Sequence, residues 1–519
     1  MKPGVKSFAR PALRPATGRR SLSRADMGFA AVCTAVFSAL AHLYRWMSAG
    51  FGLDAMMLVE SVDIENQISL GRFMQPVYWL VRGYITSPPV VGLFATAFLA
   101  LSALMVLDMT GVRSRAGIAL TCGVLAANEA LAVSYASYLP WVDVYMLAML
   151  LAMLACWLQS RLRWGFLAAP VLYCLSMALY QSYLQAAVTT VILMLMARAL
   201  EGEKPAHLLL CGIGHVLTLL AGMVLYSQAY KWAIALYGTQ ASQEYNGVLV
   251  AAMIQLEQVP RLLRETYLRP LAYLFVPGFG AFVPAWVNWL LLAAAALFAA
   301  VLARRVPRGS RALLALLAAM LPFGMNFVAF ISKGVVHMLM NYAYVFFYIL
   351  VVMLAERAAQ AGRGRLLAVA RPLAAVGVGA AVAVGCVSAQ ALYAKRDLEL
   401  QSTLSVMTRV LERLEETPGY VAGETPVAIL GYLPSSKMAM MRPGFEEISQ
   451  YQGMRSTYAD AYERSHEWYL RSLLGWNIRM VPWEECVRWQ KTEKAQEIPL
   501  FPAEDCVQMI DGIVFIRLS

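Results

Sequence analysis

Charged side chains are scarce in this sequence. Asp, Glu, Lys and Arg make up 14% of its 519 residues, whereas a soluble globular protein carries about 25%. So few charges cannot cover a surface that faces water on all sides, and the composition therefore excludes an ordinary soluble protein. The sequence also has no zinc-ligand spacing, phosphate-binding loop, dinucleotide-binding fingerprint or serine-triad motif. No internal repeat is evident, which argues against the transporters that are built from repeats.

Long apolar runs recur along the chain. Hydrophobic residues account for 60% of it. They gather in runs of about 18 residues or more, the length that an α-helix needs to cross roughly 30 Å of hydrocarbon. We therefore expect an all-α polytopic membrane protein with about eleven transmembrane helices. The expected spans are residues 27–47, 88–108, 116–134, 139–158, 165–181, 183–200, 208–229, 284–303, 311–331, 337–355 and 369–392.

Basic residues in the loops predict the orientation of these helices. Residues 1–26 are rich in Lys and Arg, and the apolar run behind them is too long for a signal-peptide core, so a disordered cytoplasmic tail is expected there. The even-numbered loops carry groups of basic residues, whereas Lys333 is the only one in three of the short odd-numbered loops. Because Lys and Arg stay on the cytoplasmic side, loops 48–87 and 230–283 and the chain after about residue 393 are expected outside. The same placement explains the net charge of +11 without a nucleic-acid partner.

Two short segments decide details of this topology. Spans 165–181 and 183–200 are separated by almost nothing, and if they formed one broken helix the C-terminus would change sides. The apolar stretch 270–284 is too short to cross the bilayer, and we expect it to lie in the interface or to re-enter.

The composition changes to that of a soluble domain from Ala394 onward. Apolar residues at helical spacing predict an amphipathic helix over 400–414. Later segments predict strands and a hairpin with a two-residue turn at Asp511-Gly512. The strands are expected at 426–433 and 478–481, and those of the hairpin at 507–510 and 513–518. The chain is thus divided into a tail at 1–26, a transmembrane domain at 27–392 and a small α/β domain at 393–519.

Two of the eight cysteines, Cys486 and Cys506, lie in this outer domain. In an oxidising compartment they would form a disulfide that closes a loop of about 20 residues. Two free thiols are the alternative.

Acidic residues follow the first span on its outer side. A carboxylate at the membrane surface is a suitable base for the hydroxyl that attacks a lipid-linked group. Asp54 is nearest to the span, and Glu60 and Asp63 come after it. The alternative is a solvated acidic loop without a chemical role.

Basic side chains near the outer ends of the spans fit a lipid phosphate. Arg72, in Gly71-Arg72-Phe73, offers a fork of donors that suits phosphate or carboxylate. Lys333 and His337 flank the start of the tenth span, where a lipid phosphate would lie. Each of the three also fits an interfacial residue that anchors the chain.

Polar residues near other outer helix ends also have two interpretations. Glu129 and Asp143 must face protein or water rather than lipid, and pairing with a polar neighbour explains them as well as catalysis does. Tyr180 and Gln181, at a tight outer turn, suit either sugar contacts or the capping of helix ends.

Four stretches, in this order, resemble the Gtr type II glucosyltransferases, membrane enzymes that modify O-antigen and other surface polysaccharides. They are Asp54 through Gly71-Arg72-Phe73, Asn128 through Ser134-Tyr135 to Asp143, Leu179-Tyr180-Gln181, and Pro499-Leu500-Phe501-Pro502 followed by Asp511-Gly512. The family often has adjacent acids where this chain has Leu53-Asp54, and a proline where it has Glu129.

The resemblance implies a GT-C type fold and the transfer of glucose or a related hexose from a polyprenyl-phosphate carrier to a polysaccharide or lipid-linked glycan. The reaction would take place on the outer face of the bacterial inner membrane. Asp54 would be the base, and Arg72, Lys333 and His337 would bind the donor phosphate. No cofactor is assigned from the resemblance, and a requirement for a divalent metal stays open. Contacts to the sugar or acceptor would come from Glu60, Asp63, Asn128, Glu129, Asp143, Tyr180 and Gln181.

Two other functions use similar parts. A transporter or flippase for a lipid-linked saccharide would explain the spans and the interfacial charges, but it needs no soluble outer domain and should carry charges in mid-span. A polysaccharide polymerase or ligase also acts on lipid-linked sugars outside the membrane, but it usually keeps its functional bulk in one large loop between late spans.

Overall fold

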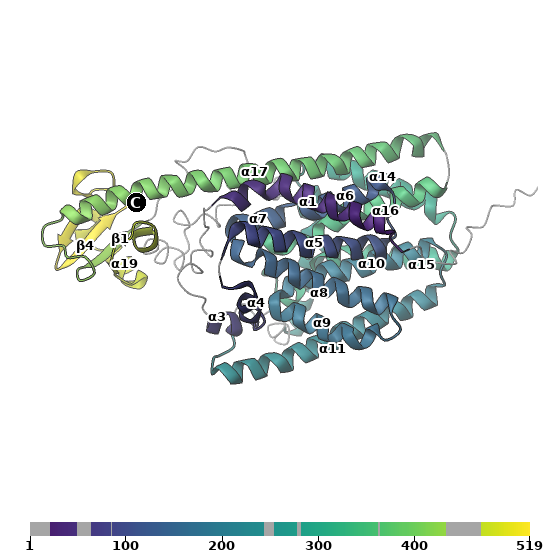
Figure 1. Ribbon diagram of the computed structural model, residues 1–519, viewed down its shortest axis with the longest axis horizontal. Coiled ribbons are helices and arrows are strands. Elements are labelled where there is room, and N and C mark those ends of the chain that lie inside the picture. The colour runs from purple at the N-terminus through teal and green to yellow at the C-terminus, as the bar shows by residue number, and fades with distance from the viewer. Residues whose placement is uncertain are drawn as a thin grey trace, which may run out of the picture.

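A bundle of long, roughly parallel helices makes up most of the molecule, and a small α/β domain lies beyond one end of it (Figure 1). The computed structural model describes residues 21–48, 64–84, 86–242, 254–277, 282–361, 364–431 and 469–518. Within these ranges, ten helices are long and apolar enough to cross a membrane. The predicted all-α polytopic fold is thereby confirmed. Asp54, Glu60 and Asp63 lie outside the described residues.

Most crossings of the bundle are single helices. Three helices outside the crossings, α3 (Ile64–Ser69), α4 (Gln75–Arg82) and α13 (Val259–Phe275), pack against the bundle. The crossing helices are α1 (Arg24–Met47), α5 (Pro88–Thr110), α6 (Arg115–Ala126) with α7 (Glu129–Ser137), α8 (Val142–Arg161), α9 (Gly165–Tyr180), α10 (Leu184–Leu200), α11 (Pro205–Tyr237), α14 (Ala285–Ala303), α15 (Arg308–Ile331), η4 (Met338–Val345) with α16 (Phe346–Ala361), and α17 (Arg365–Glu416).

The candidate span Gly165–Leu200 consists of two arms that run in opposite directions. Extended backbone at Tyr180 (φ −164°, ψ 116°) and a short turn of 3₁₀ helix interrupt it. Leu179, at the end of α9, accepts a hydrogen bond from Gln75 of α4, at the end of the bundle nearest the α/β domain. Glu201, just after α10, pairs with Arg357 at the opposite end (2.9 Å). Counted as two crossings, these arms bring the described helices to the eleven spans expected from the sequence.

Helix α17 is one continuous helix of 52 residues, about 78 Å long at 1.5 Å per residue. The expected span 369–392 and the expected amphipathic helix 400–414 are therefore parts of the same element. Its first part packs on α1, α14 and α16, and its last turns place Met407, Val410 and Leu414 in the core of the α/β domain. Figure 1 shows α17 running along the whole bundle and into that domain.

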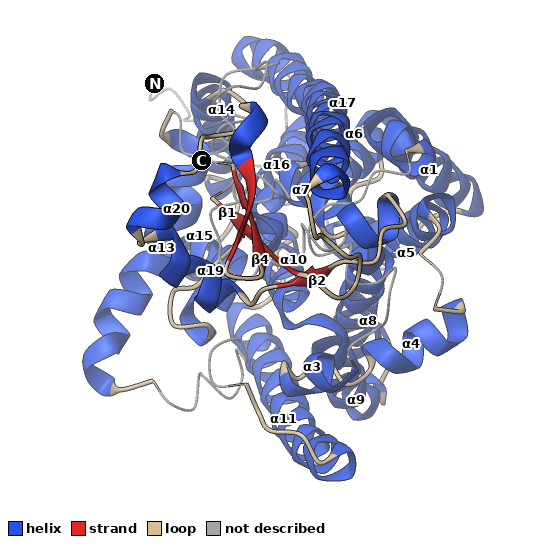
Figure 2. Cartoon of the chain, turned by 90° about the vertical axis from the view of Figure 1, so that its left-hand side faces the viewer, coloured by secondary structure: helices blue, strands red, loops and turns tan. Residues whose placement is uncertain are grey.

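The α/β domain contains a four-stranded sheet in the order β2-β1-β4-β3. Strand β1 is parallel to β2 and β4, whereas β3 and β4 form the expected antiparallel hairpin. Asp511 and Gly512 have positive φ angles (52° and 81°), as the two central residues of a type I′ hairpin turn require. The strands (red in Figure 2) are β1 (Pro426–Leu430), β2 (Arg479–Met480), β3 (Val507–Ile510) and β4 (Ile513–Arg517).

The predicted disulfide is not formed. Cys486, on helix α19 (Trp483–Gln490), donates a hydrogen bond to the carbonyl of Val481 and packs with Phe515. Cys506 accepts a hydrogen bond from Arg413 of α17 (2.9 Å). Helices α17 and α19 cover opposite faces of the sheet, since alternate residues of β1 contact one or the other. The two thiols are buried on different sides of the sheet and are not bonded to each other.

Candidate functional site

Arg72 lies at the end of the bundle that faces the α/β domain, in the turn between α3 and α4. Gly71 supplies the positive φ of this turn (79°), and the Arg72 guanidinium lies over the Tyr180 ring at 5.1 Å. Gln181 donates to the Tyr226 hydroxyl (2.6 Å), which in turn donates to the Gly71 carbonyl (2.9 Å). These hydrogen bonds connect the break between α9 and α10 to the turn that contains Arg72. Three of the predicted site residues, Arg72, Tyr180 and Gln181, are neighbours.

His337 and Arg269 extend this group of basic side chains. His337 precedes the first residue of η4, and Arg269 of α13 donates to the carbonyl of Val336 beside it (2.9 Å). Burial lowers the pKa of His337 below its ordinary value, and the neighbouring guanidinium groups of Arg269 and Arg72 lower it further. An imidazole and two guanidinium groups from three separate elements therefore converge. We call Arg72, Arg269 and His337 the cationic cluster; the two guanidinium groups carry its positive charge, and the lowered pKa makes His337 a neutral hydrogen-bonding partner beside them.

Lys333 makes no hydrogen bond or ion pair with these three described residues. It lies in the connection between α15 and η4, with its backbone in the left-handed region (φ 52°). Its half-buried ammonium forms no ion pair with any residue that the structure describes. Arg269, by contrast, was not expected from the sequence. The predicted loop 230–283 contains no motif around Arg269. Its role is recognised only because helix α13 places Arg269 beside η4.

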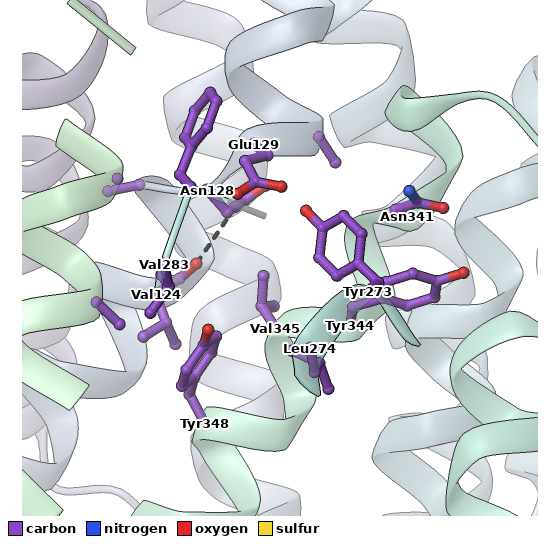
Figure 3. A pocket seen from close by; sticks show the side chains of 15 residues that line it. Val124, Asn128, Glu129, Tyr273, Leu274, Val283, Asn341, Tyr344, Val345 and Tyr348 are labelled. Carbon is purple, nitrogen blue, oxygen red and sulfur yellow. Dashed lines mark hydrogen bonds between the residues drawn. The ribbon is translucent and has the colours of Figure 1, made fainter. Parts of the chain in front are cut away.

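A cavity of about 40 Å³ lies between α7, α13, η4 and α17 (Figure 3). Glu129, which is 6% exposed, lines it, and its Oε2 accepts no hydrogen bond from any residue in the described ranges. Asn128 lines it too, but its side chain caps α7: Oδ1 accepts from the Leu131 amide (3.0 Å) and Nδ2 donates to the Leu125 carbonyl (2.9 Å). The other lining residues are Val124, Ala127, Ala130, Tyr273, Leu274, Phe282, Val283, Asn341, Tyr344, Val345, Tyr348, Ala381 and Gly385.

Asp143 does not line this cavity. Its carboxylate accepts from Arg82 of α4 (2.7 Å) and from the Tyr78 hydroxyl (2.8 Å). The Asp143 and Arg82 side chains are 0% and 2% exposed. Of the two interpretations drawn from the sequence, the contacts favour pairing with polar neighbours, which ties α4 to the start of α8.

Comparison with known proteins gives one match. The family model described as Glucosyl transferase GtrII matches residues 54–355, which is more than half of the chain. No curated protein and no solved structure matches. The matched region contains Arg72, Arg269, His337 and every described residue of the cavity up to Tyr348. With its apolar bundle, the chain therefore belongs to the GtrII glucosyl transferase family and is a multi-pass membrane glycosyltransferase.

Proposed function

We propose that the chain transfers a hexose, glucose or a close relative, from a polyprenyl-phosphate carrier to a surface polysaccharide or other glycan on the outer face of the bacterial inner membrane. The observation that carries the proposal is the cationic cluster at one end of a membrane-spanning bundle. As the bond between the anomeric carbon and the phosphate oxygen breaks, the departing polyprenyl phosphate gains negative charge. Fixed positive groups stabilise charge that develops in this way.

The proton of the acceptor must go to a base. In the proposed reaction the acceptor hydroxyl attacks the anomeric carbon, Asp54 takes the hydroxyl proton, and polyprenyl phosphate leaves with the bonding electrons. Asp54 is in the connection between α1 and α3, and the turn that carries Arg72 follows α3 directly. The family match also begins at Asp54. The role of Asp54 as the base is supported by its position in this connection, by the start of the family match and by its acidic side chain.

Membership of a transferase family favours this function over the transporter alternative. Lys333 remains a proposed phosphate ligand because it lies four residues before His337 in the same connection. Tyr180 and Gln181, next to Arg72, remain proposed sugar or acceptor contacts, as do Glu60 and Asp63.

Orientation provides a first test. The distribution of Lys and Arg predicts a cytoplasmic N-terminus and an external α/β domain. A reporter enzyme that is active only outside the cytoplasm, fused after Ser519, should therefore be active, and the same reporter fused before Met1 should not. Activity of a cytoplasm-only reporter at the C-terminal fusion would reverse the orientation and place the cationic cluster on the wrong side.

Arg269 provides a second test. Arg269→Gln keeps a polar side chain but removes a charge, and hydrogen bonds to charged groups are worth about 1.5–3 kcal/mol. We expect kcat/KM for undecaprenyl phosphate glucose to fall about 10- to 100-fold. Arg264→Gln, on the exposed side of the same helix, is the matched control and should change little. If both variants transfer glucose at the same rate, the donor phosphate does not bind at Arg269.

A further inference from the structure

Two buried acceptor atoms face the same cavity without a donor. Glu129 Oε2 and Asn341 Oδ1 each accept no hydrogen bond from any described residue, and both residues line the cavity. Figure 3 shows the two side chains reaching it from different helices. Burial of polar atoms without partners is costly, and native proteins keep few such atoms. Two of them in one cavity indicate that a ligand with hydrogen-bond donors completes the site.

No described residue of the cavity wall donates to those two atoms. The hydroxyl groups of Tyr344 and Tyr348 already donate hydrogen bonds to the side-chain oxygens of Asn326 (2.8 Å) and Asn288 (2.9 Å), respectively. These two tyrosines therefore present mainly aromatic surface to the cavity. Tyr273 packs edge to face with Tyr344 at 5.0 Å, and its hydroxyl, which forms no hydrogen bond with a described residue, is also available to a ligand. A ligand that fits must carry hydroxyl donors as well as C–H groups that pack against rings. A sugar has both.

The size of the cavity limits what enters. Its volume is about 40 Å³, and one water needs roughly 10–15 Å³ in this measure. The space therefore suits the hydroxyl-bearing edge of one sugar ring and excludes a polyprenyl chain.

The cavity and the cationic cluster share two structural elements. On α13, Tyr273 of the cavity comes four residues after Arg269 of the cluster, a rise of about 6 Å along an α-helix. On η4, Asn341 of the cavity comes four residues after His337 of the cluster. A phosphate bound by the cluster would thus hold its esterified hexose next to the cavity. Glu129 reaches the same cavity from α7.

We infer that this cavity binds the hydroxyl-bearing edge of the hexose that is being transferred, with Glu129 and Asn341 as the acceptors that select the sugar. The inference rests on the proposed function and assigns both residues to the donor sugar rather than to the glycan acceptor. A hexose that lacks a matching hydroxyl leaves an acceptor unpaired inside the protein. Sites built to hydrogen-bond a hydroxyl discriminate strongly against such analogues.

Lipid binding to the full chain in one detergent separates the two parts of the site. Undecaprenyl phosphate tests the cationic cluster alone, and undecaprenyl phosphate glucose tests the cluster and the cavity together. Wild-type protein should bind the glucose-bearing lipid at least about tenfold more tightly. Glu129→Met and Asn341→Leu, which remove the acceptor oxygens at similar side-chain size, should each lose most of that difference while their Kd for undecaprenyl phosphate stays at the wild-type value. Glu399→Gln, at a buried glutamate of α17 away from the cavity, is the control for changes at buried glutamates and should keep the difference.

Other results overturn the inference in distinguishable ways. If wild-type protein binds both lipids equally, or if Glu129→Met and Asn341→Leu keep the wild-type preference, the cavity does not bind the sugar and the proposed function still stands. If wild-type protein binds neither lipid, the proposed function fails, and the inference fails with it.

Discussion

Replacement of Asp54 by Asn is expected to lower the transfer rate by roughly 100- to 10,000-fold, the usual contribution of a general base. Asparagine keeps the size of the side chain and much of its hydrogen bonding, but it cannot take the proton of the attacking hydroxyl. Expression should barely change, because a position in a long connection between two helices contributes little to stability. The measurement is transfer of labelled glucose from undecaprenyl phosphate glucose to glycan, with variants purified in one detergent.

Glu60→Gln and Asp63→Asn are the matched controls for Asp54→Asn. They remove one carboxylate each from the same connection between α1 and α3, and each should cost much less than Asp54→Asn. Near-normal turnover by Asp54→Asn, together with loss of activity in one of the controls, would move the base to that residue. Normal turnover by all three would reject a base in this loop, and the unpaired carboxylate of Glu129 would become the next one to test.

Replacement of Asp143 by Ala is expected to destabilise the folded protein by roughly 3–5 kcal/mol, the usual effect of removing one partner from a buried ion pair. The variant would leave the Arg82 guanidinium, which is 2% exposed, without its counter-charge, and the Tyr78 hydroxyl without its acceptor. The measurement is the midpoint of thermal unfolding in detergent, and the yield of folded protein should fall with it.

A double variant distinguishes a structural role from a role in binding. Arg82→Met with Asp143→Leu replaces the pair by apolar side chains of similar volume, which is often neutral for stability. This double variant should recover most of the lost stability and most of the transfer activity. If Asp143→Ala instead unfolds like wild-type protein and yet fails to transfer glucose, Asp143 contacts the sugar or acceptor, as the family resemblance implied.

The transmembrane architecture was predictable because the bilayer imposes a simple rule on the sequence. Each crossing needs a long apolar run, and such a run is visible without knowledge of its neighbours. The hairpin at Asp511-Gly512 was predictable for an equally local reason, since two residues with positive φ favour Asp and Gly.

The continuity of α17 was missed although its cause is in the sequence. Composition changes at Ala394, which suggests a boundary between domains. No Gly or Pro occurs between Gly385 and Pro418, however, so nothing interrupts the backbone hydrogen bonds of the helix. A change in what surrounds a helix does not require a change in the helix itself.

The site was predictable only in part, because it depends on packing between distant segments. Arg72 and His337 were identified by residue type and by their position near outer helix ends. Arg269 and Asn341 were not, because their contribution arises from the way α13 and η4 lie against each other. The sequence shows that Tyr273 follows Arg269, and Asn341 follows His337, by four residues. It does not show how α13 and η4 align with each other, and that alignment brings the residues to one site.

The unbroken α17 couples the height of the α/β domain above the membrane to its rotation. In an α-helix each residue adds about 1.5 Å of length and turns the chain by about 100°. A relative of this protein that gained one residue in α17 between the bundle and the sheet would therefore carry the domain slightly higher and facing another direction. Only changes close to whole numbers of turns, such as about seven or about eleven residues, would raise the domain and still present the same face to the cationic cluster. The length of this connection is thus restricted in steps, unlike that of a flexible linker, which varies freely.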